Sequence, residues 1–219
     1  VIGHDNRMYS DEYSMICADV MTSFGIKVYL FEKNHLTPTP IISYCIRQLK
    51  TSGGIIVTAS HNPKNYNGYK IYNPDGGQIL PDVAAEVESY LPSSIGLTNI
   101  KYKANKKLIK YIPEKLVDKY FKDVQKALVH KSLTKKIKKW PVIVTCHHGT
   151  ASKYLPKFLK SLHFNVIPVK EQCFYDPNFT NSPSSNPEAF DSFDLSIKYA
   201  NKYKANICIG VDPDADRMA

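Results

Sequence analysis

The sequence predicts an α/β protein made of two successive α/β domains, in which mixed sheets are sandwiched by helices. Short apolar runs such as GIIV and PVIVT alternate with longer segments whose apolar residues recur every three or four positions. That alternation of strand-like and helix-like segments is typical of layered α/β folds. A polar, lysine-rich stretch near the middle separates two such series, and 219 residues are enough for two ordinary domains.

The first series contains four predicted strands and three predicted helices. Ser10 is expected to cap the first helix and Gly25 to end it, while Pro40 and Pro81 stand at positions that favour helix starts. The turn NPDGGQ follows the last strand. In chain order the elements are strand 1–5, helix 11–24, strand 27–31, helix 41–49, strand 53–60, strand 68–72 and helix 82–91.

A second series follows a polar stretch at residues 92–112. We place the boundary in this stretch, which predicts domains at residues 1–105 and 106–219. A helical stripe over residues 114–129 and a continuous apolar strand, PVIVTC, open the second domain. The remaining elements are helix 152–162, strand 165–169, irregular segment 170–190, helix 189–203 and strand 205–212.

Composition narrows the class of protein. The net charge is +9, but the lysine clusters at residues 101–115 and 131–140 lack the aromatic or glycine-rich pattern of a nucleic-acid module, so we expect solvated surfaces and no nucleic-acid partner. No apolar stretch is long enough for a membrane helix. Five cysteines without paired spacing predict free thiols in a reducing compartment such as the cytoplasm.

The loop TASHNPKNYNGYK follows the GIIV strand and groups several reactive side chains. Ser60 falls where the strand enters the loop, which exposes a hydroxyl suited to a nucleophile or phosphoryl carrier. His61 is poorly placed to be its base and better placed to contact a substrate oxygen or phosphate. Lys70, on the next strand, can return beside Ser60 and stabilise charge or move a proton. An ordinary polar turn is the alternative interpretation.

The last residues, GVDPDADRMA, place three alternating aspartates after a buried strand. Two unit charges 4 Å apart repel by about 4 kcal/mol at an effective dielectric constant of 20. Asp212, Asp214 and Asp216 are therefore expected to converge on a hard cation such as Mg²⁺, with Arg217 as a nearby counter-charge. A solvated acidic turn is the alternative, although the loop directly follows the apolar run ICIGV.

Together the two loops resemble the α-D-phosphohexomutase family. TASHNPKNYNGYK resembles its phosphoserine loop and DPDADR its metal loop. GHDNR, HHGTA and DPNF…NPE resemble further segments of the family's first two domains, in the same order. NPKNYNGYK and DPDADR look most like the branch of phosphoglucomutase-2 and phosphopentomutase. The family has four domains, so the resemblance implies that this sequence is a piece of something longer. The third domain, which recognises the sugar, and the fourth, which binds the substrate phosphate, would be missing from it.

The resemblance implies a role for each candidate residue. Ser60 would carry the phosphoryl group, and its phosphate would join Asp212, Asp214 and Asp216 as ligands of Mg²⁺. Lys70 would be the general acid/base. His61 and Arg217 would hold phosphate or sugar oxygens, and Asp216 is a further substrate-binding candidate. Arg7 is a weaker candidate of the same kind, with a structural surface arginine as the alternative.

The implied reaction moves a phosphoryl group between the C1 and C6 (or C5) hydroxyls of a hexose or pentose phosphate. It would pass through phosphoserine and a sugar bisphosphate, with glucose 1,6-bisphosphate as intermediate or activator. Two alternatives stay open. One is a phosphatase with Asp212 as nucleophile and Asp214 as acid, and the other is a non-catalytic anion-binding module that uses the lysine clusters.

Overall fold

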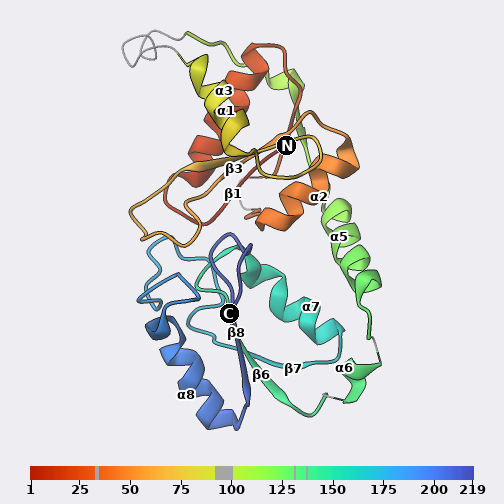
Figure 1. Ribbon diagram of the computed structural model, residues 1–219, viewed down its shortest axis with the longest axis vertical. Helices are drawn as coiled ribbons and strands as arrows, with labels where there is room; N and C mark the ends of the chain where they lie inside the picture. The colour runs from red at the N-terminus through yellow and green to blue at the C-terminus, as the bar shows by residue number, and fades with distance from the viewer. Residues whose placement is uncertain (33–34, 92–100, 131, 137) are drawn as a thin grey trace.

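The structure is a computed structural model that describes residues 1–32, 35–91, 101–130, 132–136 and 138–219. The two successive α/β units predicted from the sequence are confirmed, and Figure 1 shows them one above the other. The first sheet has five strands in the order β4-β3-β1-β2-β5. It is mixed, because β3 and β4 are antiparallel while the other neighbours are parallel. The strands are β1 (Ile2–His4), β2 (Val28–Leu30), β3 (Gly54–Val57), β4 (Tyr69–Tyr72) and β5 (Ile109–Tyr111).

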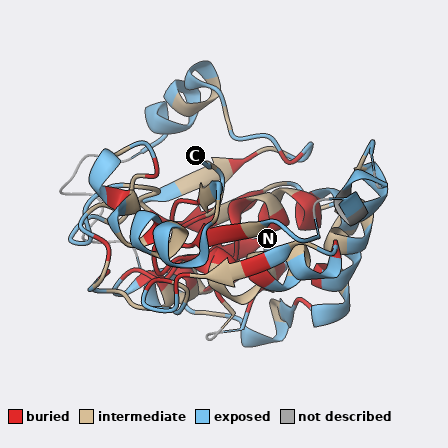
Figure 2. Ribbon diagram, turned by 90° about the horizontal axis from the view of Figure 1, so that it is seen from below, coloured by how far each residue is buried: buried red, intermediate tan, exposed pale blue. Residues whose placement is uncertain are grey.

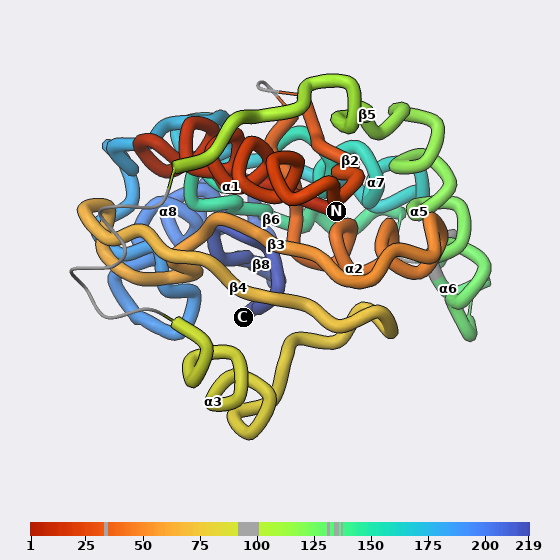
Figure 3. Tube along the Cα trace, turned by 90° about the horizontal axis from the view of Figure 1, so that it is seen from above, coloured from red at the N-terminus to blue at the C-terminus, as the bar shows by residue number. Residues whose placement is uncertain are grey.

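Helices cover both faces of the first sheet (Figure 3). Helix α1 (Ser10–Ser23) packs against Leu30 and Ile55. Helix α2 (Thr39–Leu49) packs against Ile56, which points to the other face because side chains alternate along a strand. Helix α3 (Pro81–Ser89) follows the edge strand β4 and has no buried residue. Buried residues accordingly concentrate in the strands and the inner helix faces (Figure 2).

The second sheet has three parallel strands in the order β7-β6-β8. Its predicted helix at 152–162 starts as a 3₁₀ turn, and the α-helix itself begins at Leu155, where Pro156 fits the first turn. The strands are β6 (Pro141–Thr145), β7 (Asn165–Pro168) and β8 (Ile207–Gly210). The helical segments are α6 (Leu133–Lys136), η2 (Thr150–Lys153), α7 (Leu155–Ser161), η3 (Phe190–Phe193) and α8 (Asp194–Tyr203). In the described part of the chain, no helix is long and apolar enough to cross a membrane.

The boundary predicted between residues 105 and 106 is too early for the sheet. After a short 3₁₀ segment, η1 (Lys106–Leu108), strand β5 pairs with β2 and completes the first sheet. Helix α5 (Glu114–Ala127) then buries Val117 in the first core, beside α2. The apolar stripe of α5 therefore contacts both units, because its Phe121 also stacks on Tyr154 and packs against Phe158 of the second unit. Residues 92–100 of the predicted linker lie outside the described residues.

The carboxyl ends of the two sheets face each other, and the loops that leave them meet between the units (Figure 1). The amide of Thr39, at the start of α2, donates to the carbonyl of Asp214 at 2.8 Å. Ser60, after β3, reaches Asp212, after β8. The crevice beyond the carboxyl ends of strands is where α/β proteins generally bind ligands.

Candidate active site

The serine loop, residues 58–68, joins β3 to β4 and presents Ser60. The amide of Thr58 donates to the carbonyl of Gly68 at 3.0 Å and closes the base of the loop. Ser60 has φ of 53°, a left-handed conformation that costs an L-residue about 1 kcal/mol. Its amide donates to Thr58 Oγ1 at 2.9 Å, which supports this conformation. Its hydroxyl is thereby turned toward the second unit and donates to Asp212 Oδ2 at 3.2 Å.

The acidic loop, residues 211–217, follows β8 and gathers three carboxylates. Asp212 and Asp214 are fully buried, while Asp216 is exposed. One oxygen from each lies within 4.8 Å of the others. The amides of Asp216 and Arg217 both donate to Asp212 Oδ1 at 3.1 Å, which folds the loop around Asp212. Burial, and then the charges of Asp214 and Asp216, raise the pKa of Asp212 to about 7.

Lys70 lies against the acidic loop. Its Nζ is 2.8 Å from Asp214 Oδ2 and 2.7 Å from Asp216 Oδ2. Burial alone would lower the pKa of Lys70, but the two carboxylates outweigh it and raise the pKa well above its ordinary value. The sequence predicts Lys70 beside Ser60. Within the described residues, its hydrogen bonds go instead to the carboxylates.

His61 and Arg217 flank the serine hydroxyl. His61 Nδ1 lies 3.4 Å from Ser60 Oγ, so the ring is closer to that oxygen than simple chain geometry suggests. Burial, followed by the charge of Arg217, lowers the pKa of His61. Arg217 Nε donates to Asp212 Oδ2 at 3.2 Å, and its Nη1 lies 3.7 Å from Glu188. Arg217 Nη2 is buried without a hydrogen-bond partner among the described residues, which suits an incoming anion.

Arg7 is placed differently from the other candidates. It is 3% exposed, and its guanidinium donates to backbone carbonyls of the serine loop. The sequence-based expectation that Arg7 holds substrate oxygens therefore conflicts with its contacts, because these N–H groups are already bonded. Of the predicted residues, the structure brings Ser60, His61, Lys70, the three aspartates and Arg217 together, with Arg7 beneath the loop.

Sequence reasoning missed Thr39 as a site residue. Its amide and its hydroxyl both donate to Asp214, the hydroxyl at 3.2 Å to Oδ2. Thr39 is also the first residue of α2, so the positive end of that helix lies at a buried carboxylate. The segment TPTP predicts a stiff loop before a helix. No local pattern predicts that the start of this helix pairs with Asp214, which lies 175 positions further along the chain.

The turn after β6 supports the acidic loop from behind. Thr150 donates its amide to the carbonyl of Pro213 at 2.8 Å. Gly149 lies so close to Pro213 that a Cβ at this position would stand 2.5 Å from the same carbonyl oxygen. HHGTA resembles a family segment, and the structure shows that its glycine permits this contact.

His147, in this turn, is expected to make the stability of the chain depend on pH. It is fully buried, and burial followed by the charge of His148 lowers its pKa from 6.5 to about 4. The folded state therefore keeps His147 neutral while the unfolded chain takes up a proton, so the stabilisation is present above pH 6.5 and lost as pH falls toward 4. We expect this residue to contribute about 3 kcal/mol of that loss.

The check is the free energy of unfolding, measured by urea denaturation from pH 7.5 to pH 4.5. His147→Gln should flatten the decline, whereas His130→Gln, at an exposed position, should keep it. An unchanged slope in His147→Gln would contradict the prediction.

Comparison with known families identifies the class of protein. The model of phosphoglucomutase/phosphomannomutase alpha/beta/alpha domain I matches residues 1–94, and that of domain II matches residues 118–219. The chain belongs to this family of phosphohexomutases, as the two loops predict.

Individual relatives agree. A phosphomannomutase from Mycoplasmoides pirum is 40% identical over 220 residues, covering 100% of this chain and 40% of the relative. A phosphoglucomutase from Staphylococcus haemolyticus is 40% identical over 225 residues with the same coverage. A structure from Thermus thermophilus, described as a candidate phosphomannomutase, shares the fold with a TM-score of 0.80 at 24% identity, covering 99% of this chain and 46% of its own. This chain spans about 40% of the length of the curated relatives.

Proposed function

We propose that this chain is the phosphoserine- and metal-bearing part of a phosphosugar mutase. The observation that carries the proposal is the 3.2 Å hydrogen bond from Ser60 Oγ to Asp212 Oδ2. It joins residues 152 positions apart and places the hydroxyl of the serine loop on Asp212, a member of the cluster of three carboxylates. Curated relatives named phosphomannomutase and phosphoglucomutase support the same reaction class.

The acidic loop fits a divalent cation such as Mg²⁺. Its donors are carboxylate oxygens, the preferred ligands of hard cations, and Asp214 Oδ1 is buried without a hydrogen-bond partner among the described residues. Asp212, Asp214 and Asp216 would hold the ion together with the phosphate on Ser60. A bound Mg²⁺ neutralises charge on the transferring phosphoryl group.

The chain's own residues account for the transfer. A free hydroxyl of a sugar phosphate attacks the phosphorus on Ser60 and gives up its proton, while the bond to Ser60 Oγ breaks and Oγ takes up a proton, so the number of protons is unchanged. The resulting bisphosphate turns over in the site and returns its other phosphoryl group to Ser60. Lys70 is our candidate for both proton transfers: its ammonium donates a proton to Ser60 Oγ, and the resulting amine takes up the proton that the sugar hydroxyl gives up. His61 and Arg217 hold phosphate oxygens, and Asp216 offers its exposed side to the sugar.

The phosphatase alternative is weaker. It gives no role to the Ser60 hydroxyl, which the serine loop presents to Asp212 Oδ2 at 3.2 Å. The anion-binding alternative leaves the contact between Ser60 and Asp212 unexplained.

We also propose the partners and the compartment. The substrate is a phosphorylated hexose or pentose, and glucose 1,6-bisphosphate serves as the phosphoryl source that loads Ser60. Cytoplasmic location is favoured by free cysteines, of which Cys45 and Cys146 are fully buried.

The test is mass spectrometry of the intact protein and its peptides, before and after incubation with glucose 1,6-bisphosphate and Mg²⁺. We expect one phosphate on Ser60, absent from Ser60→Ala and retained in the exposed control Ser52→Ala. Phosphate trapped on Asp212 would favour the phosphatase. Absence of phosphate from Ser60, both in this chain and in the longest natural form of the protein, would contradict the mutase mechanism.

A further inference from the structure

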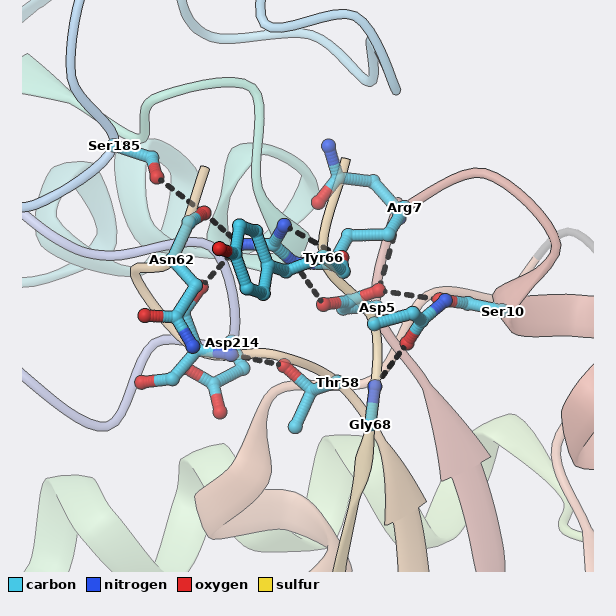
Figure 4. A network of polar contacts seen from close by, with 12 residues as sticks. Asp5, Arg7, Ser10, Thr58, Asn62, Tyr66, Gly68, Ser185 and Asp214 are labelled. Atoms are coloured by element: carbon cyan, nitrogen blue, oxygen red, sulfur yellow. Dashed lines mark hydrogen bonds and ion pairs between the residues drawn. The ribbon is translucent and has the colours of Figure 1, made fainter. Parts of the chain in front are cut away.

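A buried ion pair lies directly beneath the serine loop (Figure 4). Arg7 and Asp5, in the loop that follows β1, are 3% and 1% exposed. Arg7 Nε lies 3.2 Å from Asp5 Oδ2, an ion pair without hydrogen-bond geometry. Asp5 Oδ1 accepts the Arg7 amide at 2.9 Å and the Ser10 hydroxyl at 2.7 Å. The carboxylate therefore holds the arginine in one place at the end of β1.

The guanidinium of Arg7 is surrounded by carbonyl oxygens of the serine loop. Nη1 donates to the carbonyls of Pro63 at 2.7 Å and Tyr66 at 3.0 Å. Nη2 donates to those of Ser60 at 2.9 Å and Asn62 at 2.5 Å. A guanidinium has five N–H groups in a planar fork, so four go to the loop and the fifth faces Asp5. The loop is thus folded around a single buried cation.

The second unit closes over this arrangement. The ring of Phe179 lies 5.3 Å from the Arg7 guanidinium carbon. Ser185 donates its hydroxyl to the carbonyl of His61 at 3.1 Å, and Asn6 donates its side-chain amide to the carbonyl of Asp176 at 3.0 Å. These contacts exclude water from the pair and tie the serine loop to the unit that carries the acidic loop.

We propose that Arg7 is a positioning residue that sets the place of Ser60 relative to Asp212. The proposal rests on the mutase function proposed above and adds a role for a residue that does not touch the reacting atoms. One of its four carbonyl partners belongs to Ser60 itself, so a shift of Arg7 moves the residue that carries the phosphoryl group. Lysine cannot replace it, since an ammonium has three donors around a point and no planar fork.

The test compares the Arg7→Lys variant with the unsubstituted protein, both in the longest natural form. In a single turnover from phosphorylated Ser60 to a hexose phosphate, the amplitude reports the folded fraction and the rate constant reports the geometry of the site. We expect the rate constant to fall about 100-fold, the size of effect that a 1 Å misplacement produces, at nearly unchanged amplitude. Hydrogen exchange of a peptide covering residues 58–68 should become faster.

Arg47→Lys is the matched control. Arg47 donates to Ser43 Oγ at 2.8 Å and to the carbonyl of Asp75 at 3.4 Å, in an exposed position on α2. The Arg47→Lys variant should leave the rate constant and the hydrogen exchange of residues 58–68 unchanged.

The proposal is overturned if Arg7→Lys lowers the amplitude alone, or if exchange of the serine loop matches that of the original chain. If the original protein transfers no phosphoryl group from Ser60, the proposed function fails. Hydrogen exchange then decides by itself whether Arg7 holds the loop.

Discussion

Replacing Lys70 with methionine is expected to destabilise the metal-free chain by about 3 kcal/mol, because removal of one partner leaves a buried charge unpaired. The Lys70 side chain is 18% exposed and that of its partner Asp214 is fully buried, so water compensates little of the loss. A divalent cation at the acidic loop supplies positive charge at the same place. Mg²⁺ should therefore stabilise Lys70→Met more than it stabilises the original chain.

The measurement is urea denaturation of both chains with and without Mg²⁺. Lys106→Met is the control, since Lys106 pairs with Asp19 while its side chain is 62% exposed. Exposed pairs of this kind contribute about 0–1 kcal/mol to stability. Mg²⁺ should not change the difference in free energy of unfolding between Lys106→Met and the original chain. Equal Mg²⁺ responses in Lys70→Met and the original chain would show that the cation does not bind at the acidic loop.

Gly149→Ala is expected to destabilise the chain by about 3 kcal/mol and to displace the acidic loop. The added Cβ meets the backbone of Pro213, including its carbonyl oxygen at 2.5 Å, and backbone atoms cannot rotate away as a flexible side chain can. Because Pro213 lies between Asp212 and Asp214, the shift separates the two buried carboxylates. The variant should lose stabilisation by Mg²⁺ in the same denaturation experiment.

Gly25→Ala separates this steric effect from backbone strain. Gly25 has φ of +78°, and none of the residues that the structure describes lies within 4 Å of an added Cβ, so alanine should cost about 1 kcal/mol through conformation alone. Its response to Mg²⁺ should stay that of the original chain. If Gly149→Ala behaves like Gly25→Ala, the contact between the turn and Pro213 does not position the acidic loop.

Local patterns were sufficient for much of the fold. The runs GIIV and PVIVT became β3 and β6 because continuous apolar strands are buried wherever they pair. The starts of α2 and α3 followed from Pro40 and Pro81, whose φ suits the first helical turn. The serine and acidic loops were recognisable for the same reason, since each places its reactive residues within a few positions.

The α/β class, most of the order of strands and helices, and the two loops could be predicted from the sequence alone, because these depend on neighbours along the chain. The tertiary structure decided that β5 completes the first sheet, that Lys70 pairs with Asp214 and Asp216, and that Arg7 lies beneath the serine loop. Each of these depends on residues that are distant in sequence, separated by 53 positions for Arg7 and Ser60 and by 144 for Lys70 and Asp214. A buried charged side chain must be paired, and its partner is the opposite charge that folding places next to it. Local sequence patterns do not predict which residue that is.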